Sequence, residues 1–402
     1  MPVLTLNSRS NSLKYQLYDW EQREVLGRGV VERVGIGDSL LVHEIPGRLF
    51  LRREVECHDH RTALALVLET LADPAYADGG EVTAVGHRVT HGGERFARSV
   101  IINGEVLAAI EEATHLAPLH NSSNIAGIHA AQALLPAVPH IALFDTAFHQ
   151  TMPAHAYLYA LPYEWYEQHG IRRYGFHGAS HQFALKRAAA MLGKEPSECN
   201  LVTIHLTAGK GVSLCAIRGG VSVDTSMGLT PLEGVIMGTR CGDIDPGIPT
   251  FMMLEEQFSA HDMESILNQK SGRLGITGRY TERSELLSAA AKGDRRSAVA
   301  LTLENYRLKK YIGAYMAVLG KVDAVVFAGD PSAMGGRGRA DVLAGLEVFG
   351  IALDPLKNGE HGDVSGEAVV SLESAAVKVL LIPTDEELVF AEEVTCLLAG
   401  SG

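Results

Sequence analysis

The stretch VLTLNSRSNSLKYQLYD, residues Val3 to Asp19, has the plan of a strand, a small polar loop and a returning strand. A second stretch, LVTIHLTAGKGVSLCAIRGG, residues Leu201 to Gly220, has the same plan and ends in a Gly-Gly turn. Two similar hairpins favour a duplicated architecture of two domains, in which both hairpins face one cleft. Hairpins are also common in large proteins by chance, so the repetition alone leaves an unduplicated fold open.

Around the hairpins, apolar strands such as VTAVGHRV and HIALF alternate with helical patterns. Helices are predicted near Ser123–Leu135, His181–Leu192 and Arg296–Leu319, and the last two end at Gly193 and Gly320. This alternation predicts α/β layers with largely parallel strands. A chain of 402 residues can hold two or three domains and bury a large core.

Composition excludes several classes of protein. The net charge of -13 argues against a nucleic-acid binder, although a local cationic site for a small anion remains possible. Five scattered cysteines without CxxC spacing indicate a reduced, cytoplasmic setting. We see no signal sequence and no apolar run near the ~20 residues that span a bilayer, so a soluble, unexported protein is expected.

Polar residues that follow the predicted strands are the candidates for chemistry, because ligands of open α/β sheets gather at the carboxyl ends of strands. They are Arg88, Asp145, His177 and, on a glycine-rich stretch, Arg240. Each also has a structural interpretation, as an ion-pair residue, a satisfied buried histidine or a helix cap. Together with Lys14 they suit an anion that develops negative charge, as in phosphoryl transfer.

Other sites are less well supported. CHDH, Cys57 to His60, has the wrong spacing for zinc, and Asp59 is better interpreted as a helix N-cap. No GxxxxGK[ST] or GxSxG motif is present, which excludes a P-loop enzyme and disfavours an α/β hydrolase. The loop FAGDPSAMGG, Phe327 to Gly336, follows the apolar run KVDAVV and has the position of a nucleotide loop, but it contains an Asp-Pro and few glycines.

Several segments resemble the acetate kinases, a family within the larger superfamily of acetate and sugar kinases and actin. They are, in family order, NSRSNSLKYQLYD, GHRVTHGGERF, APLHN, FDTAFHQTMP, YGFHGASH, VDTSMGLTPLEGVIMGTRCGDIDPG and IPTDEEL. The resemblance covers nearly the whole chain. It implies a duplicated two-domain actin-like (ribonuclease H-like) α/β fold with a cleft between the domains. The N-terminal domain would span residues 1–150 and be completed by 384–402, and the C-terminal domain, with the nucleotide-side loops and a dimer interface, would span 151–383.

The resemblance also implies an activity, namely reversible Mg²⁺- or Mn²⁺-dependent phosphoryl transfer between ATP and acetate, giving acetyl phosphate and ADP. It further implies a cytoplasmic homodimer whose partners are small molecules rather than nucleic acid or membrane. Carried onto this sequence, Asn7 and Glu386 would organise the metal, and Lys14 would contact the donor phosphates. The catalytic residues would be Arg88, Asp145, His177 and Arg240. A carboxylic acid of pKa roughly 4 to 5 is already ionised at neutral pH, so Asp145 is expected to orient an arginine or the metal shell rather than remove a proton.

The same resemblance implies which residues bind the acetate and the phosphoryl donor. The acetate site would consist of Arg88, Thr90, Leu119, His120, Phe176 and Pro231. The donor site would consist of Ser10, Ser12, Lys14, His205, Gly209, Lys210, Gly211, Glu282, Arg283, Ser284, Gly329 and Asp330. Thr90 stands where the family usually has valine, and an apolar pocket discriminates one methylene by only about 1–3 kcal/mol, so acetate and propionate both remain open.

Departures from the family pattern cluster on the donor side. Arg9 replaces a glycine of the first hairpin, and the second hairpin is two residues longer, with Lys210 at the position of an asparagine. FAGDPSAMG replaces FTGGIGENS, which loses glycines, removes an N–H at Pro331 and adds the charge of Asp330. Three interpretations follow: an acetate kinase that uses ATP, a short-chain carboxylate kinase that uses pyrophosphate or another donor, and a non-catalytic sensor of acetyl phosphate.

Overall fold

The computed structural model describes residues 1–77, 80–207, 211–359, 364 and 366–400, and of Leu119 it describes the backbone alone. The chain divides into two compact units. Unit 1 comprises Met1–Gln150 together with the segment that starts at Asp385, and unit 2 comprises Thr151–Thr384.

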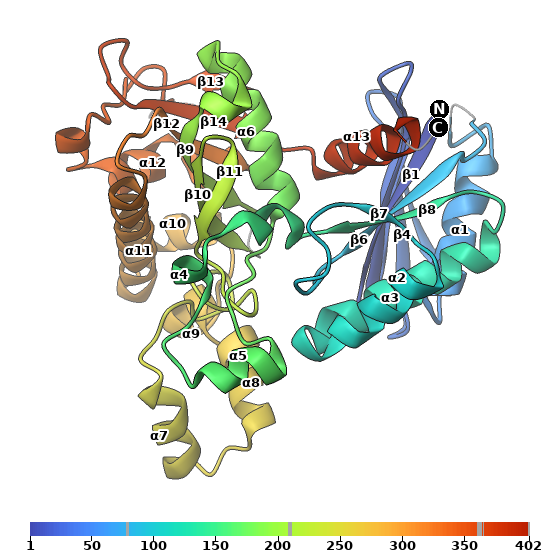
Figure 1. The fold of residues 1–402 in the computed structure, drawn as a ribbon, viewed down its shortest axis with the longest axis horizontal. Coiled ribbons are helices and arrows are strands. Elements are labelled where there is room, and N and C mark those ends of the chain that lie inside the picture. Colours follow the sequence, from blue (N-terminus) through green and yellow to red (C-terminus); the bar gives the residue numbers. More distant parts are fainter. Residues whose placement is uncertain (78–79, 208–210, 360–363, 365, 401–402) are drawn as a thin grey trace. The chain divides into compact units, whose positions relative to one another are not determined.

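Unit 1 is built on an eight-stranded sheet (Figure 1) with the strand order β5-β4-β3-β2-β1-β6-β8-β7. Strands β1 to β5 form an antiparallel meander, and β6 and β8 extend the sheet in parallel with β1. The strands are β1 (Pro2–Arg9), β2 (Ser12–Asp19), β3 (Glu24–Glu32), β4 (Ser39–Ile45), β5 (Leu49–Val55), β6 (Ala84–Val89), β7 (Val100–Ile101) and β8 (His140–Phe144).

Helices cover both faces of this sheet, and β1 shows how its side chains are divided between them. Leu4 and Leu6 belong to the core cluster that also contains Ala131 of α3, whereas a side chain at Gly86, which pairs with Thr5, would meet α13. Even-numbered residues of β1 therefore point to α3, and odd-numbered residues point to α13. The helices are α1 (His60–Ala72), α2 (Gly104–Glu112), α3 (Pro118–Leu134) and α13 (Glu386–Ala399), with 3₁₀ turns at Ala113–Leu116 and Ala147–Thr151.

Unit 2 repeats the same topology around a six-stranded sheet with the order β11-β10-β9-β12-β14-β13. Antiparallel β11, β10 and β9 are followed by β12 and β14, which run parallel to β9, just as β3, β2 and β1 are followed by β6 and β8. The duplication predicted from the two hairpins is thus confirmed. The strands are β9 (Asn200–Leu206), β10 (Val212–Arg218), β11 (Val221–Thr225), β12 (Ala324–Gly329), β13 (Ala368–Val369) and β14 (Lys378–Pro383).

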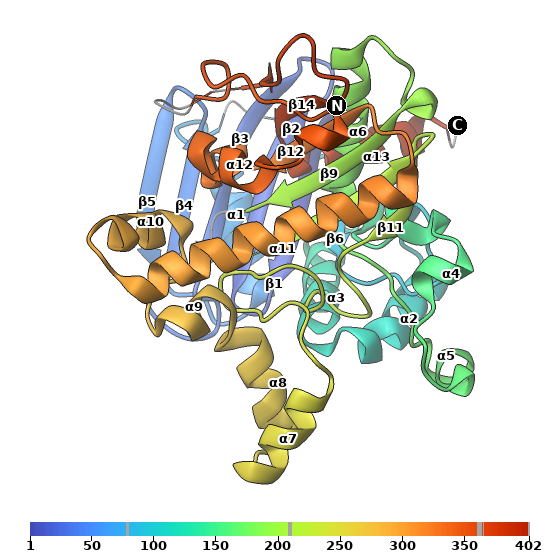
Figure 2. The ribbon, with the colours of Figure 1, turned by 90° about the vertical axis from the view of Figure 1, so that its left-hand side faces the viewer.

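Helix α11 packs along one face of the second sheet and α6 along the other (Figures 1 and 2). The inner stripe of α11 contains Leu308, Ile312, Tyr315 and Leu319, at helical spacing, within the core of unit 2. The helices are α4 (Ala154–Tyr157), α5 (Tyr163–His169), α6 (Gly178–Leu192), α7 (Gly247–Glu255), α8 (Ala260–Gln269), α9 (Gly272–Thr277), α10 (Arg283–Ala291), α11 (Arg295–Leu319) and α12 (Gly335–Leu343), with 3₁₀ turns at Pro196–Glu198, Pro331–Ala333 and Glu347–Phe349.

Several local predictions are confirmed. Helices α6 and α11 end at Gly193 and Gly320, whose φ angles of 65° and 73° favour glycine. Asp59 caps α1 by accepting a hydrogen bond from the Thr62 backbone N–H. Two helix starts were wrong: α3 begins at Pro118 rather than near Ser123, and α6 begins at Gly178 rather than near His181. Proline is well suited to a first helical position. No helix in the described ranges is both long and apolar enough to cross a bilayer.

Buried histidines give unit 1 a specific sensitivity to acid. His87 Nε2 lies 3.0 Å from His140 Nδ1, and burial lowers the pKa of His87 to about 3. The unfolded chain therefore takes up this proton near pH 6.5 while the folded chain stays neutral, so the contribution to stability is complete above pH 6.5 and falls as the pH drops toward 3.

We predict that lowering the pH from 7 to 5 costs the wild-type protein about 2 kcal/mol of unfolding free energy through this one group, since each pH unit below the unfolded pKa costs about 1.4 kcal/mol. The variant His87→Gln should be less stable at pH 7 but should lose less between pH 7 and pH 5. Urea unfolding at both pH values measures this. Equal pH sensitivity of the two proteins would contradict the assignment.

Candidate active site

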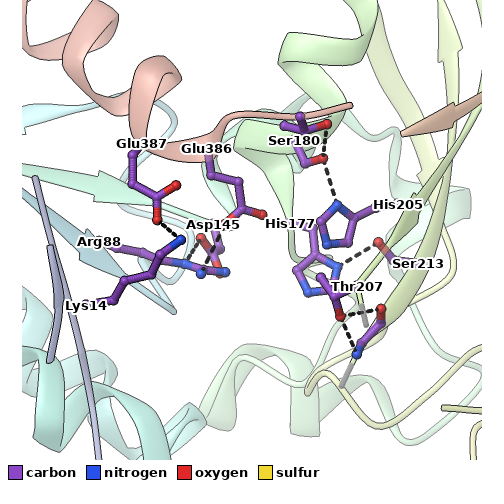
Figure 3. A network of polar contacts seen from close by, with 12 residues as sticks. Lys14, Arg88, Asp145, His177, Ser180, His205, Thr207, Ser213, Glu386 and Glu387 are labelled. Atoms are coloured by element: carbon purple, nitrogen blue, oxygen red, sulfur yellow. Dashed lines mark hydrogen bonds and ion pairs between the residues drawn. The ribbon is translucent and has the colours of Figure 1, made fainter. Parts of the chain in front are cut away.

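A buried ion pair joins the ends of β6 and β8 in unit 1 (Figure 3). Arg88 donates from Nε to one oxygen of Asp145 at 2.9 Å and from Nη2 to the other at 2.8 Å. The Arg88 side chain is 12% exposed and that of Asp145 only 5%. Burial raises the pKa of Asp145 and the Arg88 guanidinium lowers it. The bidentate geometry leaves Asp145 well placed to orient Arg88.

The first turn of α13 brings two carboxylates to the same region. Arg88 Nη1 donates to Glu386 at 3.3 Å, and Lys14 of β2 forms an ion pair with Glu387. Asp385 caps the helix by accepting from the Leu388 N–H. Acidic residues are stabilised at a helix N-terminus by the macrodipole, so the sequence of α13 favours three carboxylates at this point.

Asn7 lies on β1 directly opposite Lys14 and on the same face as α13. It is 7% exposed. An amide oxygen and one carboxylate, that of Glu386, suit Mg²⁺, which prefers oxygen ligands and commonly completes its shell with water and substrate phosphates. No group of three or more His, Cys, Asp or Glu residues forms a metal cage among the described residues. The donor set therefore fits a magnesium ion held mainly by its substrate.

Two asparagines of α3, which the sequence analysis did not single out, support this region. Asn124 accepts from the Thr90 N–H at 2.9 Å and donates to the Ser8 carbonyl at 2.7 Å. Asn121 accepts from the His91 N–H and donates back to the His91 carbonyl. Both are nearly inaccessible, and their spacing of three residues on a helix was the available signal. The half-buried side chains of Thr90 and His120 lie on this framework, whereas that of Leu119 lies outside the described residues.

In unit 2, His177 occupies the position immediately before α6 with a φ of 60°. Such a left-handed conformation is unfavourable for a side chain with a Cβ, and it clusters at functional sites. His177 Nδ1 lies 2.9 Å from the Ser213 hydroxyl, which also lies 3.0 Å from His181 Nε2. The ring of His177 is thus held in a fixed orientation (Figure 3).

His205 of β9 stacks at a tilt on His177, with ring centroids 4.1 Å apart. Its Nδ1 lies 2.7 Å from the Ser180 hydroxyl, and Ser180 donates to Thr384 at 3.1 Å. Thr384 in turn accepts from the Gly329 N–H at 2.8 Å. This chain of polar contacts connects the histidines to the end of β12, where the loop FAGDPSAMGG begins.

The two hairpin loops carry the remaining phosphate-side residues. Ser10 and Ser12 lie at the exposed β1–β2 turn of unit 1. The β9–β10 loop of unit 2 is closed by Thr207 and Gly211, whose backbone N–H donates to the Thr207 hydroxyl at 2.8 Å. A side chain at Gly211 would come within 3.2 Å of the His177 ring, so the glycine permits this close approach. Gly209 and Lys210 lie outside the described residues.

Arg240 lies on a loop without regular structure that is fixed from two sides. Its Nη1 donates to the Pro231 carbonyl at 3.4 Å. The loop carbonyls of Met237 and Gly238 accept from the backbone N–H groups of Arg273 and Leu274 at the start of α9. Phe176, another residue of the predicted acetate site, is 1% exposed and belongs to the core of unit 2.

Arg283, which is predicted to lie on the donor side, has a buried guanidinium that donates to Glu304 at 2.7 Å and to Asn305 at 2.9 Å. Its contact with a nucleotide stays a prediction. Arg273 approaches the same carboxylate at 3.3 Å. Arg283 is therefore part of the packing of α9, α10 and α11, and its neighbours Glu282, the N-cap of α10, and Ser284 start that helix.

The loop FAGDPSAMGG has the expected strand–loop–helix form. Gly329 has a φ of 79°, and a Cβ there would meet the Leu206 carbonyl at 2.2 Å, so only glycine fits. Asp330 caps the following 3₁₀ turn by accepting from the Ser332 N–H. Buried Arg339 of α12 donates to the Pro331 carbonyl at 3.0 Å, and this hydrogen bond stabilises the loop.

Comparison with known proteins identifies relatives of this chain by sequence and by structure. The family model described as the acetokinase family matches residues 2–392. The acetate kinase of Geobacter metallireducens is 59% identical over 404 residues, covering 100% of this chain and 96% of the relative. The crystal structure of Porphyromonas gingivalis acetate kinase superposes with a TM-score of 0.93 at 41% identity, covering 99% of both chains. A propionate kinase from Francisella tularensis superposes with a TM-score of 0.90 at 35% identity, covering 98% of both chains.

The buried Arg273–Glu304–Arg283 cluster predicts a large stability effect. Replacing Glu304 by Gln leaves two buried guanidinium groups without their shared carboxylate, and we expect a loss of about 3–5 kcal/mol in the free energy of unfolding. Chemical denaturation measures the loss. The control is Glu167→Gln, an exposed position on α5, which should change stability by less than about 0.5 kcal/mol. A similarly small effect of Glu304→Gln would contradict the structural role.

Proposed function

This chain belongs to the acetokinase family, and on that premise we propose that it transfers a phosphoryl group reversibly between ATP and acetate, giving acetyl phosphate and ADP. The observation that supports the proposal most directly is the bidentate Arg88–Asp145 pair with Glu386 beside it, at the carboxyl ends of β6 and β8. In open α/β sheets this edge is where ligands bind.

The chemistry needs cations more than it needs a base. In the forward direction an acetate oxygen forms a bond to the γ-phosphorus while the bond from that phosphorus to the leaving ADP oxygen breaks. Acetate is already ionised at neutral pH, so no proton has to be removed. The barrier comes from bringing one anion to another, and fixed cations and in-line positioning lower it.

The residues of unit 1 divide this work. Arg88 binds the carboxylate and the transferring phosphoryl group, and Asp145 holds the guanidinium in one orientation through two hydrogen bonds. Lys14 binds the donor phosphates. Asn7 and Glu386 would hold Mg²⁺ or Mn²⁺, which supplies charge neutralisation on the phosphate oxygens when it is bound.

His177 and Arg240 contribute from unit 2. The contact between His177 Nδ1 and the Ser213 hydroxyl fixes the imidazole plane, which suits a group that donates a hydrogen bond to charge developing on the phosphoryl oxygens. Arg240 supplies a second guanidinium, and its loop is tied down by α9 and by its own contact with Pro231.

Alternative donors and a sensor function are not favoured by a whole-chain identity of 59% to an acetate kinase. The choice of acyl group is a separate question, because one solved relative is named a propionate kinase. We propose acetate as the substrate on the larger identity, with Thr90, Leu119, Phe176 and Pro231 as walls of the acyl pocket.

We also propose a cytoplasmic homodimer that associates through α7. Ile248, Phe251 and Leu254 of this helix are 48%, 60% and 76% exposed, an apolar surface that suits a protein interface. All five cysteines are free thiols, as expected in a reducing compartment. Light scattering after size-exclusion chromatography tests the dimer, and we expect Phe251→Glu to shift the mass to that of a monomer. A wild-type monomer would sink this part of the proposal.

The activity is tested by acetyl phosphate formation from acetate and Mg²⁺, measured as acetyl hydroxamate, with ATP, GTP and pyrophosphate compared as donors and propionate as an alternative acceptor. We expect ATP and acetate to give the highest kcat/KM. No turnover with any donor would refute the proposed reaction, and turnover with pyrophosphate but not ATP would replace the donor.

The orienting role of Asp145 predicts that Asp145→Asn lowers kcat by roughly a hundredfold or more, because a misdirected Arg88 stabilises the transition state poorly. The melting temperature is recorded in parallel to verify folding. Asp38→Asn, at a highly exposed carboxylate of unit 1, is the matched control and should leave kcat unchanged. Wild-type turnover by a folded Asp145→Asn variant would rule the role out.

A further inference from the structure

Arg9 lies at the tip of β1 and points toward the same side of the sheet as the active-site residues of unit 1. A side chain at Gly127 of α3 would collide with the Ser8 hydroxyl, so Ser8 points to the α3 face. Side chains alternate along a strand, which places Arg9 on the opposite face together with Asn7. The hairpin register pairs Asn7 with Lys14 and Arg9 with Ser12, so all four residues share one face.

The backbone that carries Arg9 is fixed, whereas its side chain is exposed. His60 Nε2 at the start of α1 lies 2.7 Å from the Arg9 carbonyl oxygen. The Val34 N–H donates to the Asn11 carbonyl at 2.9 Å, and Asn124 donates to the Ser8 carbonyl. Three separate elements therefore hold the turn in place, and none of them uses the Arg9 side chain. A rigid base with an exposed guanidinium is the arrangement that a ligand-binding residue needs.

Among the described residues, the cations that neighbour Arg9 have direct carboxylate partners, whereas Arg9 has none. Arg88 is shared between Asp145 and Glu386, and Lys14 is paired with Glu387. Within the part of the chain that the structure describes, no ion pair to the Arg9 guanidinium is found. Desolvation and repulsion from Arg88 lower the pKa of Arg9, and the carboxylates of Glu386 and Asp145 oppose this shift. An arginine nevertheless stays protonated, so its charge is available to an incoming anion.

We propose that Arg9 binds the oxygens of the phosphoryl group that is transferred, as a third cation of unit 1 beside Arg88 and Lys14. The inference rests on the proposed function and adds a residue to it. A guanidinium presents paired N–H donors that match two phosphate oxygens, and bonds of this charge-assisted kind are among the strongest in proteins. No proton is exchanged, since Arg9 acts by neutralising charge and by positioning.

The experiment compares Arg9→Gln, which keeps length but removes charge, with Arg9→Lys, which keeps charge but removes the paired donors. Arg53→Gln, at an exposed arginine of β5 in the same sheet, is the control. We expect Arg9→Gln to lower kcat/KM for ATP and for acetyl phosphate by about 10- to 100-fold, as for loss of one hydrogen bond to a charged group. Arg9→Lys should recover part of this loss, the KM for acetate should change less than about twofold, and the melting temperature should not change.

Any one of the following results would overturn the proposal. One is a kcat/KM of Arg9→Gln for acetyl phosphate within about twofold of wild type. Another is an equal loss toward acetate and acetyl phosphate together with a lowered melting temperature, which would indicate a structural role. If the wild-type protein turns over no donor, the proposed function fails, and the role of Arg9 is tested by calorimetric binding of acetyl phosphate instead. Equal dissociation constants for wild type and Arg9→Gln would then overturn the role of Arg9. So would the absence of binding to wild type.

Discussion

The pair formed by Arg88 and Asp145 is the interaction on which the functional part of unit 1 depends. Two charges taken out of water lose several kcal/mol of solvation each, and only good geometry with further hydrogen bonds restores it. Here the guanidinium uses three of its donor positions on two carboxylates, which come from the end of β8 and from the start of α13. The pair can exist only if β6 and β8 are parallel neighbours, because only then do their carboxyl ends meet. The site chemistry therefore depends both on the parallel pairing of β6 with β8 and on the position of α13.

The corresponding edge of unit 2 is held by hydroxyl and imidazole groups instead of an arginine–carboxylate pair. Its hairpin, helix and parallel strands repeat the arrangement of unit 1, but at the corresponding edge the contacts run between hydroxyls and imidazoles. Ser213 links His177 and His181, and Ser180 links His205 to Thr384. A network of this kind costs little desolvation and fixes ring orientation through many short bonds. The two units therefore share one topology but hold the side chains at this edge with different kinds of contact.

Much of the fold and part of the candidate site could be predicted from the sequence, because the signals for them were local. Strand–loop–strand patterns predicted both hairpins, and Gly193 and Gly320 predicted helix ends from their freedom at positive φ. The positions of Arg88 and Asp145 followed from the rule that strand ends carry function. Non-local polar pairing was not predictable. Arg283 stands in an exposed-looking polar run, yet it is buried because Glu304, 21 residues later in the chain, supplies its counter-charge. Asn121 and Asn124 were missed for the same reason, since their partners are distant in sequence: His91 in the loop after β6, and Ser8 on β1.

The origin of α13 has a consequence for the synthesis of this protein. The helix that brings Glu386 to Arg88 and Glu387 to Lys14 belongs to unit 1, yet it follows all of unit 2 in the chain. A ribosome that adds about 5–20 residues per second therefore exposes β1, β6 and β8 well before their last partner. During that interval Arg88 has only one of its two carboxylates. The nascent chain can form the sheet of unit 1 early, but its ionic site can be completed only after Glu386 and Glu387 have been added.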